Sequence, residues 1–307
     1  MFGILPWVLQ LPKESEVTLS LRGKVAIITG ANRGLGLEIA RQYVRSGASI
    51  MVCARDHERL NTVAANLITV ANEGQRVEWM AIDVARPDDV RTVVDATLSR
   101  FGQIDALVNN AGIYGPMGMI ETVDWMQWVK TIEVNLLGSV QMCQAVLPTM
   151  KARGKGKIIQ ISGGGATNPL PGLSAYAASK AAIVRFTETL AEEVRGDGIE
   201  VNAVAPGALN TRLLDEVLAA GSEKVGAAFF AKAVKQKESG GTPLTIGAEL
   251  AVFLASDQSN GITGKLISAV WDDWKAWPEH LEELRSSDVY TLRRIAGRDR
   301  GLEWGDK

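Results

Sequence analysis

The sequence predicts an α/β fold: a single doubly wound parallel sheet of about seven strands, with helices on both faces. Two observations support this prediction. Short apolar, β-branched runs alternate along the chain with longer segments whose apolar residues recur at helical spacing. The first apolar run ends in a glycine-rich turn, Thr29-Gly-Ala-Asn-Arg-Gly-Leu-Gly36, that leads directly into a helical segment. No internal repeat and no second turn of this kind follow, so we expect one domain of this type.

The predicted strands are short runs rich in Val, Ile and Ala, bounded by glycine or polar residues. They cover residues 24–29, 49–54, 77–82, 104–108, 157–161, 200–205 and 264–269. The predicted helices carry end signals: the first stops at Gly47, and the third begins with Pro87 and two aspartates, which suit the positive end of a helix dipole. The helices cover 35–46, 56–72, 87–101, 123–150 with a bend near Gly138, 175–195, 213–220, 223–237 and 245–256.

Three further segments are distinguished by pattern. Residues 22–270 form the predicted domain, and within it residues 211–243 interrupt the strand–helix alternation near the carboxyl edge of the sheet. We expect that interruption to be a lid over a substrate. Residues 1–21 are predicted to be an N-terminal arm. Residues 271–307, which are rich in tryptophan, are predicted to be a C-terminal tail that packs on the domain or a partner, or shapes the substrate pocket.

The composition excludes several classes of function. The chain has 307 residues and a net charge of −2, so neither nucleic acid nor an anionic membrane is an expected partner. Its two cysteines and two histidines lack the spacing of a metal site and fit a cytoplasmic protein. No apolar run reaches the ~20 residues that span a bilayer, so no integral membrane span is expected. Residues 1–11 leave open an interfacial membrane anchor.

Tyr176 and Lys180 carry the clearest chemical signal. On a helix, residues four apart share one face. A lysine ammonium beside a phenol favours the phenolate, so we expect the pKa of Tyr176 to fall below its usual value near ~10. A phenol tuned in this way exchanges a proton near neutral pH. Because the glycine turn is suited to cradle a pyrophosphate at a helix N-terminus, the two features together predict hydride exchange at a carbon–oxygen bond.

Six motifs follow one another along residues 22–269: Thr29-Gly30-x-x-x-Gly34-x-Gly36, Asp83-Val84, Asn109-Asn110-Ala111-Gly112, Asn135, Tyr176-x-x-x-Lys180, and Pro206-Gly207 with Thr211. With these motifs in this order, the sequence resembles the short-chain dehydrogenase/reductase family over that range. The resemblance implies a Rossmann-like fold, an NAD(P) cofactor, a small-molecule substrate and a homodimer or homotetramer.

The resemblance also implies a role for each matching residue. Tyr176 matches the general acid/base, Lys180 the residue that binds the nicotinamide ribose and lowers the tyrosine pKa, and Asn135 the residue that holds a water in a proton relay. The other expected cofactor-binding positions belong to the glycine turn, the end of the second strand, the adenosine segments and the nicotinamide segment. They are Gly30, Asn32, Arg33, Gly34, Leu35, Gly36, Arg55, Asp83, Val84, Asn110, Ala111, Gly112, Pro206, Gly207, Leu209 and Thr211.

One position departs from the family pattern. Where this chain has Gly163, the family has a serine whose hydroxyl polarises the substrate carbonyl. Ser162 is one residue early, and a shift of one residue along a strand points a side chain to the opposite face unless a bulge re-aims it. Ser162 is kept as a candidate for that role, with Ser174, Thr167, a water, a substrate group or a backbone N–H as alternatives. Gly163 and Gly164 are predicted to border the substrate.

The second strand indicates which cofactor is preferred. An acidic residue at its end favours NAD, whereas a nearby arginine favours the 2′-phosphate of NADP. The family position for the acid holds Ala54, followed by Arg55, and Arg33 lies in the glycine turn. Two guanidiniums pair well with a phosphate dianion. NADP(H) is therefore the preferred cofactor and NAD(H) the alternative, because Asp56 is able either to reach the ribose or to cap the next helix.

We therefore expect an NADP(H)-dependent oxidoreductase that interconverts a secondary alcohol and a ketone on a sugar, a polyol or a 3-oxoacyl compound. The alternative is a cofactor-binding protein with weak or no turnover, or a redox-neutral epimerase or dehydratase, because Gly163 removes the usual serine.

Overall fold

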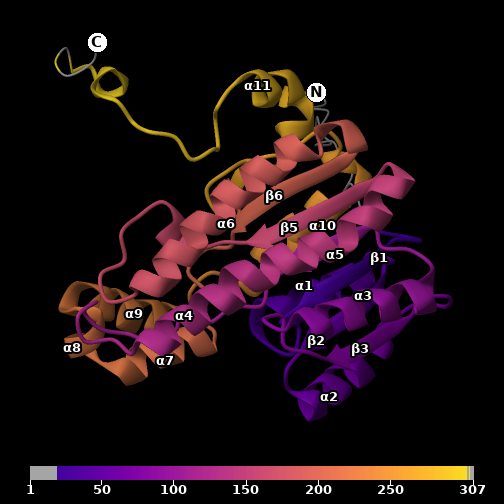
Figure 1. Cartoon of the computed structure of the whole chain (residues 1–307), viewed down its shortest axis with the longest axis horizontal. Coiled ribbons are helices and arrows are strands. Elements are labelled where there is room, and N and C mark those ends of the chain that lie inside the picture. Colours follow the sequence, from indigo (N-terminus) through magenta and orange to yellow (C-terminus); the bar gives the residue numbers. More distant parts are fainter. Residues whose placement is uncertain (1–18, 303, 305–307) are drawn as a thin grey trace, which may run out of the picture.

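The computed structural model describes residues 19–302 and 304. Its centre is a seven-stranded sheet in the order β3-β2-β1-β4-β5-β6-β7, with every neighbouring pair parallel (Figure 1). The strands are β1 Val25–Thr29, β2 Ser49–Ala54, β3 Val77–Ala81, β4 Ala106–Asn109, β5 Gly156–Ile161, β6 Ile199–Ala205 and β7 Leu266–Ser268. The predicted doubly wound α/β fold is confirmed. The strand order reverses between β1 and β4, which is where such sheets bind ligands at their carboxyl ends.

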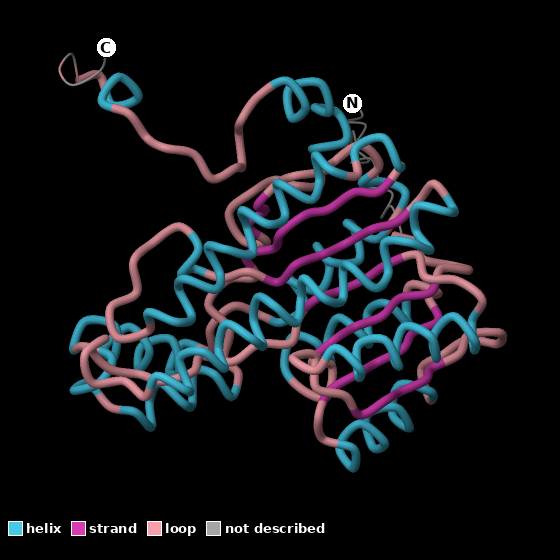
Figure 2. Tube along the Cα trace, in the orientation of Figure 1, coloured by secondary structure: helices cyan, strands magenta, loops and turns pink. Residues whose placement is uncertain are grey.

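Helices, drawn in cyan in Figure 2, cover both faces of the magenta strands. Alternate residues of a strand face opposite sides, so Ile28 and Val52 enter one apolar core while Ile27 and Met51 enter the other. The first core is completed by α1 Gly34–Arg45, α2 His57–Ile68 and α10 Leu244–Ala255. The second is completed by α3 Pro87–Phe101, α5 Gly138–Arg153 and α6 Ser174–Glu193. Helix α2 ends earlier than the 56–72 that was expected, and its last residue, Ile68, is exposed.

The long helical region predicted at 123–150 is divided by a π-helical turn. Helix α4 covers Trp125–Ile132, the π turn covers Glu133–Leu137, and α5 follows without a break. The irregularity lies just before Gly138, where a bend was expected. A Cβ on Gly138 would lie 2.8 Å from Val84 Cγ2, so this glycine lets the helix approach the loop after β3. Single π turns occur frequently at functional sites.

A small helical unit projects from the carboxyl edge of the sheet. It contains α7 Arg212–Ala220, α8 Ser222–Val225 and α9 Ala227–Ser239, and appears beside α4 in Figure 1. Four buried residues of these helices form an apolar cluster of their own: Leu214, Val217, Val225 and Ala233. The prediction of a single helix at 223–237 is wrong, because Gly226, at φ +81°, separates α8 from α9.

The C-terminal segment is more closely built into the domain than predicted. Trp274 and Trp277 are each 5% exposed and belong to the main core, although both were assigned to a tail. Helix α11, Leu281–Ser286, follows, and the chain then continues mainly as a loop (Figure 2). At the other end, Leu21 is buried in the same core. The rest of the predicted arm, residues 1–18, lies outside the described residues.

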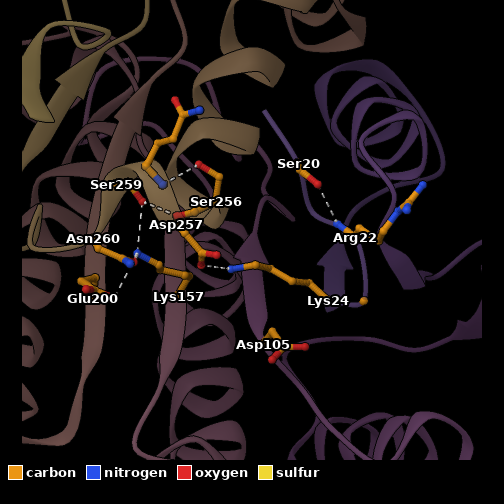
Figure 3. A network of polar contacts seen from close by, with 12 residues as sticks. Ser20, Arg22, Lys24, Asp105, Lys157, Glu200, Ser256, Asp257, Ser259 and Asn260 are labelled. Atoms are coloured by element: carbon orange, nitrogen blue, oxygen red, sulfur yellow. Dashed lines mark hydrogen bonds and ion pairs between the residues drawn. The ribbon is translucent and has the colours of Figure 1, made fainter. Parts of the chain in front are cut away.

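A polar network holds the amino ends of the strands together (Figure 3). Lys24 Nζ lies 2.6 Å from Asp257 Oδ1, and the buried Lys157 Nζ lies 3.1 Å from Glu200 Oε2. Lys157 also donates to Ser259 Oγ and Asn260 Oδ1. Burial lowers the pKa of Lys157, while Glu200 opposes that shift. These contacts join β5 to β6, and join both β5 and the start of β1 to the segment after α10, at the edge of the sheet opposite the ligand-binding edge.

Neither a membrane-spanning helix nor a metal-binding cluster is present among the described residues. None of their helices combines the length and apolarity that crossing a bilayer requires. None of their His, Cys, Asp and Glu side chains gather in a group of three or more that could hold a metal ion. Cys53 and Cys143 are buried free thiols, and burial raises the pKa of each to about 12.

Candidate active site

The glycine turn between β1 and α1 forms a tight cradle. Gly30 and Gly34 have φ values of +65° and +55°, which only glycine adopts readily. A Cβ on Gly36 would lie 2.4 Å from the Gly30 carbonyl oxygen, so the turn folds closely on itself. Helix α1 begins at Gly34, and its unpaired first-turn N–H groups and dipole favour an anion there. The cradle therefore fits a pyrophosphate.

Asn110 fixes this turn to the end of β4. Its Nδ2 donates to the carbonyl oxygens of Thr29 and Gly30, at 2.9 and 3.1 Å. The Thr29 hydroxyl in turn accepts the backbone N–H groups of Asn110 and Ala111, both at 3.0 Å. These bonds join the glycine turn to the carboxyl end of β4.

Arg33, Arg59 and Arg212 gather beside the glycine turn, where all three line the same cavity. Arg59 donates from Nε to the Asn32 carbonyl oxygen at 2.8 Å. Burial lowers the pKa of the Arg33 guanidinium, and the charges of Arg59 and Arg212 lower it further. Arg59 and Arg212 were not predicted; the available signal was their position in the first turn of helices that begin at the carboxyl edge of the sheet. The Asp56 carboxylate accepts the Arg59 backbone N–H at 3.0 Å and caps α2.

Tyr176 and Lys180 lie one turn apart on α6, as the spacing predicted. The Lys180 Nζ donates to the Ile161 carbonyl oxygen at 2.7 Å and lies 5.7 Å from the centroid of the Tyr176 ring. Burial lowers the pKa of Lys180 to about 8. Burial also raises the pKa of Tyr176, and the neighbouring Tyr114 raises it further. The prediction that Lys180 lowers the pKa of the Tyr176 phenol is wrong. Burial makes the phenolate costly to form, and this cost outweighs the effect of the nearby ammonium.

Asn135 lies in the π turn, and its side chain forms hydrogen bonds with other residues of the chain. Its Oδ1 accepts the Ile113 backbone N–H at 2.8 Å, and its Nδ2 donates to the Ile113 carbonyl oxygen at 2.9 Å and to Ser179 Oγ at 3.0 Å. Ser179 Oγ donates to the Tyr176 carbonyl oxygen at 2.7 Å. The Asn135 side chain thus joins the loop after β4 to the helix that carries Tyr176.

The segment after β5 passes directly beside the Tyr176 hydroxyl. A Cβ on Gly163 would lie 2.5 Å from Tyr176 Oη. Ser162 is 3% exposed, and its hydroxyl donates to the Lys180 carbonyl oxygen at 3.4 Å. Of the other candidate hydroxyls, Ser174 accepts from the Trp128 indole and Thr167 accepts from an amide.

One cavity of about 1140 Å³ connects the glycine cradle to Tyr176. Every predicted site residue lines it except Asn135, which lies behind the wall. The lining residues that the sequence analysis missed come from the start of α2, from loops and from the small helical unit. They include Arg59, Tyr114, Asn168, Arg212, Phe229, Lys232, Gln236, Trp271 and Asp272.

Comparisons with known proteins agree with this geometry. A model of the short chain dehydrogenase family matches residues 24–221. The chain is similar to an L-fucose dehydrogenase of Oryctolagus cuniculus, at 35% identity over 238 residues that cover 77% of this chain and 80% of the relative.

Two solved structures are also similar. One is a gluconate 5-dehydrogenase from Burkholderia cenocepacia in complex with NADP and tartrate, at 33% identity and a TM-score of 0.72, covering 82% of this chain and 95% of that chain. The other is an NAD⁺-bound xylitol dehydrogenase, at 27% identity and a TM-score of 0.73, covering 80% of this chain and 97% of that chain. This chain thus belongs to the short-chain dehydrogenase/reductase family and is an NAD(P)-dependent enzyme that acts on CH–OH groups.

Proposed function

We propose that this chain is an NADP(H)-dependent oxidoreductase that interconverts a secondary alcohol and a ketone on a sugar or polyol. The observation that carries the proposal is the single cavity that joins an anion-binding glycine cradle to the Tyr176 hydroxyl. The bound nicotinamide supplies or accepts the hydride. Tyr176 then gives a proton to the ketone oxygen or takes one from the alcohol.

Lys180 supports this proton transfer by position and charge. Its ammonium is anchored by the Ile161 carbonyl and lies under the Tyr176 ring, inside the cavity wall. With a pKa lowered by burial to about 8, it is still mostly charged at neutral pH. We assign it the binding of the nicotinamide ribose. Asn135 is assigned the positioning of the Tyr176 helix through Ser179, as well as the water of the relay.

The preference for NADP(H) rests on the arginines. Arg33 and Arg55 line the cavity, Arg59 adds a third guanidinium, and Asp56 is occupied as a helix cap. Removing a charged partner of the 2′-phosphate should weaken NADPH binding by about tenfold to a hundredfold and leave NADH binding unchanged. Fluorescence titration of Arg33→Ala and Arg55→Ala with both nucleotides tests this, with Arg91→Ala on the exposed face of α3 as the control. Equal losses for both nucleotides would contradict the preference.

Gly163 is proposed to stand where the family has its serine. In support, the Cβ that a serine would add there falls within 2.5 Å of Tyr176 Oη. The Ser162 hydroxyl is bonded to the Lys180 carbonyl, so we assign it a structural role. The cofactor-binding protein with weak turnover remains the second candidate, since this glycine removes a donor from the reacting oxygen.

The sugar or polyol substrate is supported by the relatives and by the cavity. The similar proteins act on L-fucose, gluconate and xylitol. The cavity wall presents Asn168, Lys232 and Gln236, which suit hydroxyl groups or a carboxylate. The 3-oxoacyl alternative would place an acyl chain against the apolar lid residues such as Phe229.

The test is turnover with L-fucose, xylitol, gluconate and an acetoacetyl thioester, using NADP(H) and NAD(H), followed by the absorbance of the reduced nicotinamide. We expect turnover with at least one of the sugars or polyols, faster with NADP(H). Tyr176→Phe should lower kcat by about 10²–10⁴-fold while nucleotide binding persists. A Tyr176→Phe variant with normal turnover would refute the role, and nucleotide binding without turnover would favour the second candidate.

The association state is also proposed. Ala177, Ala178, Ala181 and Ala182 lie on α6, and none of them is buried in the chain's own core. Such small side chains let a helix of a second copy approach closely, which supports a homodimer or homotetramer. Light scattering on the purified protein distinguishes these from a monomer.

A further inference from the structure

Tyr114 is an aromatic residue in contact with Tyr176 that the sequence motifs did not single out. The two rings meet edge to face, with centroids 4.5 Å apart and planes at 73°. This geometry is favourable for aromatic pairs and holds the two phenols side by side. Both residues line the cavity that leads to the glycine cradle.

The backbone before Tyr114 is held firmly. Asn135 bonds both the N–H and the carbonyl oxygen of Ile113, the preceding residue. On its other side, the Tyr114 ring packs against the apolar cluster of the small helical unit, α7 to α9, which includes Leu214 and Val217. The position of Tyr114 is therefore set from both sides and is not that of a free surface side chain.

The hydroxyl of Tyr114 forms no hydrogen bond with any group in the described part of the chain, and neither does that of Tyr176. The buried polar atoms that lack a partner there are oxygens of Gln141, Gln160 and Glu188. The Tyr114 hydroxyl is not among them, so it is reachable from the cavity. Burial raises the pKa of Tyr114, which keeps its hydroxyl protonated, and thus a donor, at neutral pH.

A ketone oxygen in this cavity needs a second donor. Its two lone pairs accept two hydrogen bonds, and Tyr176 supplies one of them. Gly163 supplies no side chain, and the Ser162 hydroxyl is already bonded to the Lys180 carbonyl. Tyr114 presents an unpaired phenol beside the first one.

We propose that Tyr114 is a catalytic residue whose hydroxyl donates the second hydrogen bond to the substrate oxygen beside Tyr176. The proposal rests on the proposed alcohol–ketone activity. During reduction the carbonyl carbon gains a hydride from the reduced nicotinamide, and the carbonyl oxygen gains the proton of Tyr176. Tyr114 keeps its own proton throughout and stabilises the negative charge that develops on that oxygen.

The first test is kinetic. Tyr114→Phe keeps the ring contacts and removes only the hydroxyl, so kcat on the best sugar or polyol found should fall by about 10²–10³-fold, with the NADPH dissociation constant unchanged. Tyr290→Phe, a tyrosine of the C-terminal segment whose ring packs on Trp277, serves as the control and should keep the wild-type kcat. A Tyr114→Phe variant within threefold of the wild-type kcat would overturn the proposal.

The second test needs no turnover. The chain has four tyrosines, so protein labelled with ¹³C at the phenol carbon gives four signals that phenylalanine variants assign. Adding xylitol, L-fucose or gluconate to the protein with NADP⁺ should move the Tyr114 and Tyr176 signals together. Movement of neither signal, or of Tyr176 alone, would sink the role of Tyr114. Failure of the wild type to turn over any substrate, with both signals moving, would refute the proposed activity and leave the Tyr114 contact standing.

Discussion

The two ends of the cavity are built in different ways. At the nucleotide end, backbone lies against backbone: a Cβ on Gly36 would meet the Gly30 carbonyl oxygen, and one on Gly30 would lie 2.8 Å from Ala111 Cα. At the substrate end, a Cβ on Gly163 would meet the side chain of Tyr176 and no backbone, and one on Gly164 would meet nothing within 4 Å. The first end is therefore specified by a local motif. The second depends on side chains that tertiary packing brings in from distant segments.

The largest effect is expected in the C-terminal segment, which packs into the main core from a distant part of the chain. Trp277→Ala should lower the free energy of unfolding by about 3–5 kcal/mol, because this side chain is 5% exposed within the main core. Trp304→Ala removes a residue that is 75% exposed and should change stability by less than about 0.5 kcal/mol. Urea unfolding of both variants measures the contrast. Equal stability of the two would mean that the C-terminal segment is not part of the core.

A glycine pair tests the contrast directly. Gly36→Ala forces a Cβ onto a backbone oxygen, so we expect a loss of about 1–3 kcal/mol in stability and a marked loss of NADPH affinity. Gly164→Ala meets open space and should leave both quantities unchanged. Thermal unfolding measures the stability of the two variants, and NADPH titration measures their affinity for the nucleotide. An NADPH affinity that survives Gly36→Ala would show that the turn relaxes easily.

The buried amine between the two ends predicts a dependence of stability on pH. The pKa of Lys180 is lowered to about 8 in the folded chain from 10.5, so between these values the unfolded chain binds the extra proton. Stability from this group therefore rises with pH across that window, by about 2 kcal/mol between pH 8 and pH 10. Lys180→Met keeps the length and removes the titration. The difference in unfolding free energy between wild type and variant should grow by that amount, and a flat difference would contradict the shift.

The smallest effect on stability is expected at Asp56, beside the nucleotide end of the cavity. Asp56 caps α2 by accepting the Arg59 N–H, so Asp56→Ala should cost about 1 kcal/mol of stability. Asp56→Asn keeps a capping oxygen and should cost little. NADH titration of Asp56→Ala adds a second measure: a large loss of NADH affinity there would show that the carboxylate binds a ribose rather than the helix.

The same contrast explains what the sequence could predict. The strands, the main helices and the residues of the glycine turn follow from local patterns, and the six turn residues that were expected to bind the cofactor all line the cavity. Tyr114 and Trp271 reach the same cavity from separate segments, and no motif beside them in the sequence predicts this. Arg59 offers only its position in the first turn of α2. The phenol pKa was predicted in the wrong direction because spacing gives the neighbour of Tyr176 but not the depth of its burial. The split of α8 from α9 depends on the conformation of one glycine, Gly226.

The segment that follows β7 has a consequence for the outer border of the sheet. β7 pairs with β6 on one side only, so its other side would offer bare amide groups. The Leu266 N–H instead donates to the Tyr290 carbonyl oxygen at 2.8 Å, and the Ser268 N–H donates to the Asp272 carboxylate at 2.7 Å. A strand of another chain could pair with this edge only by displacing the chain's own C-terminal residues. These residues therefore protect the edge of the sheet against uncontrolled strand addition.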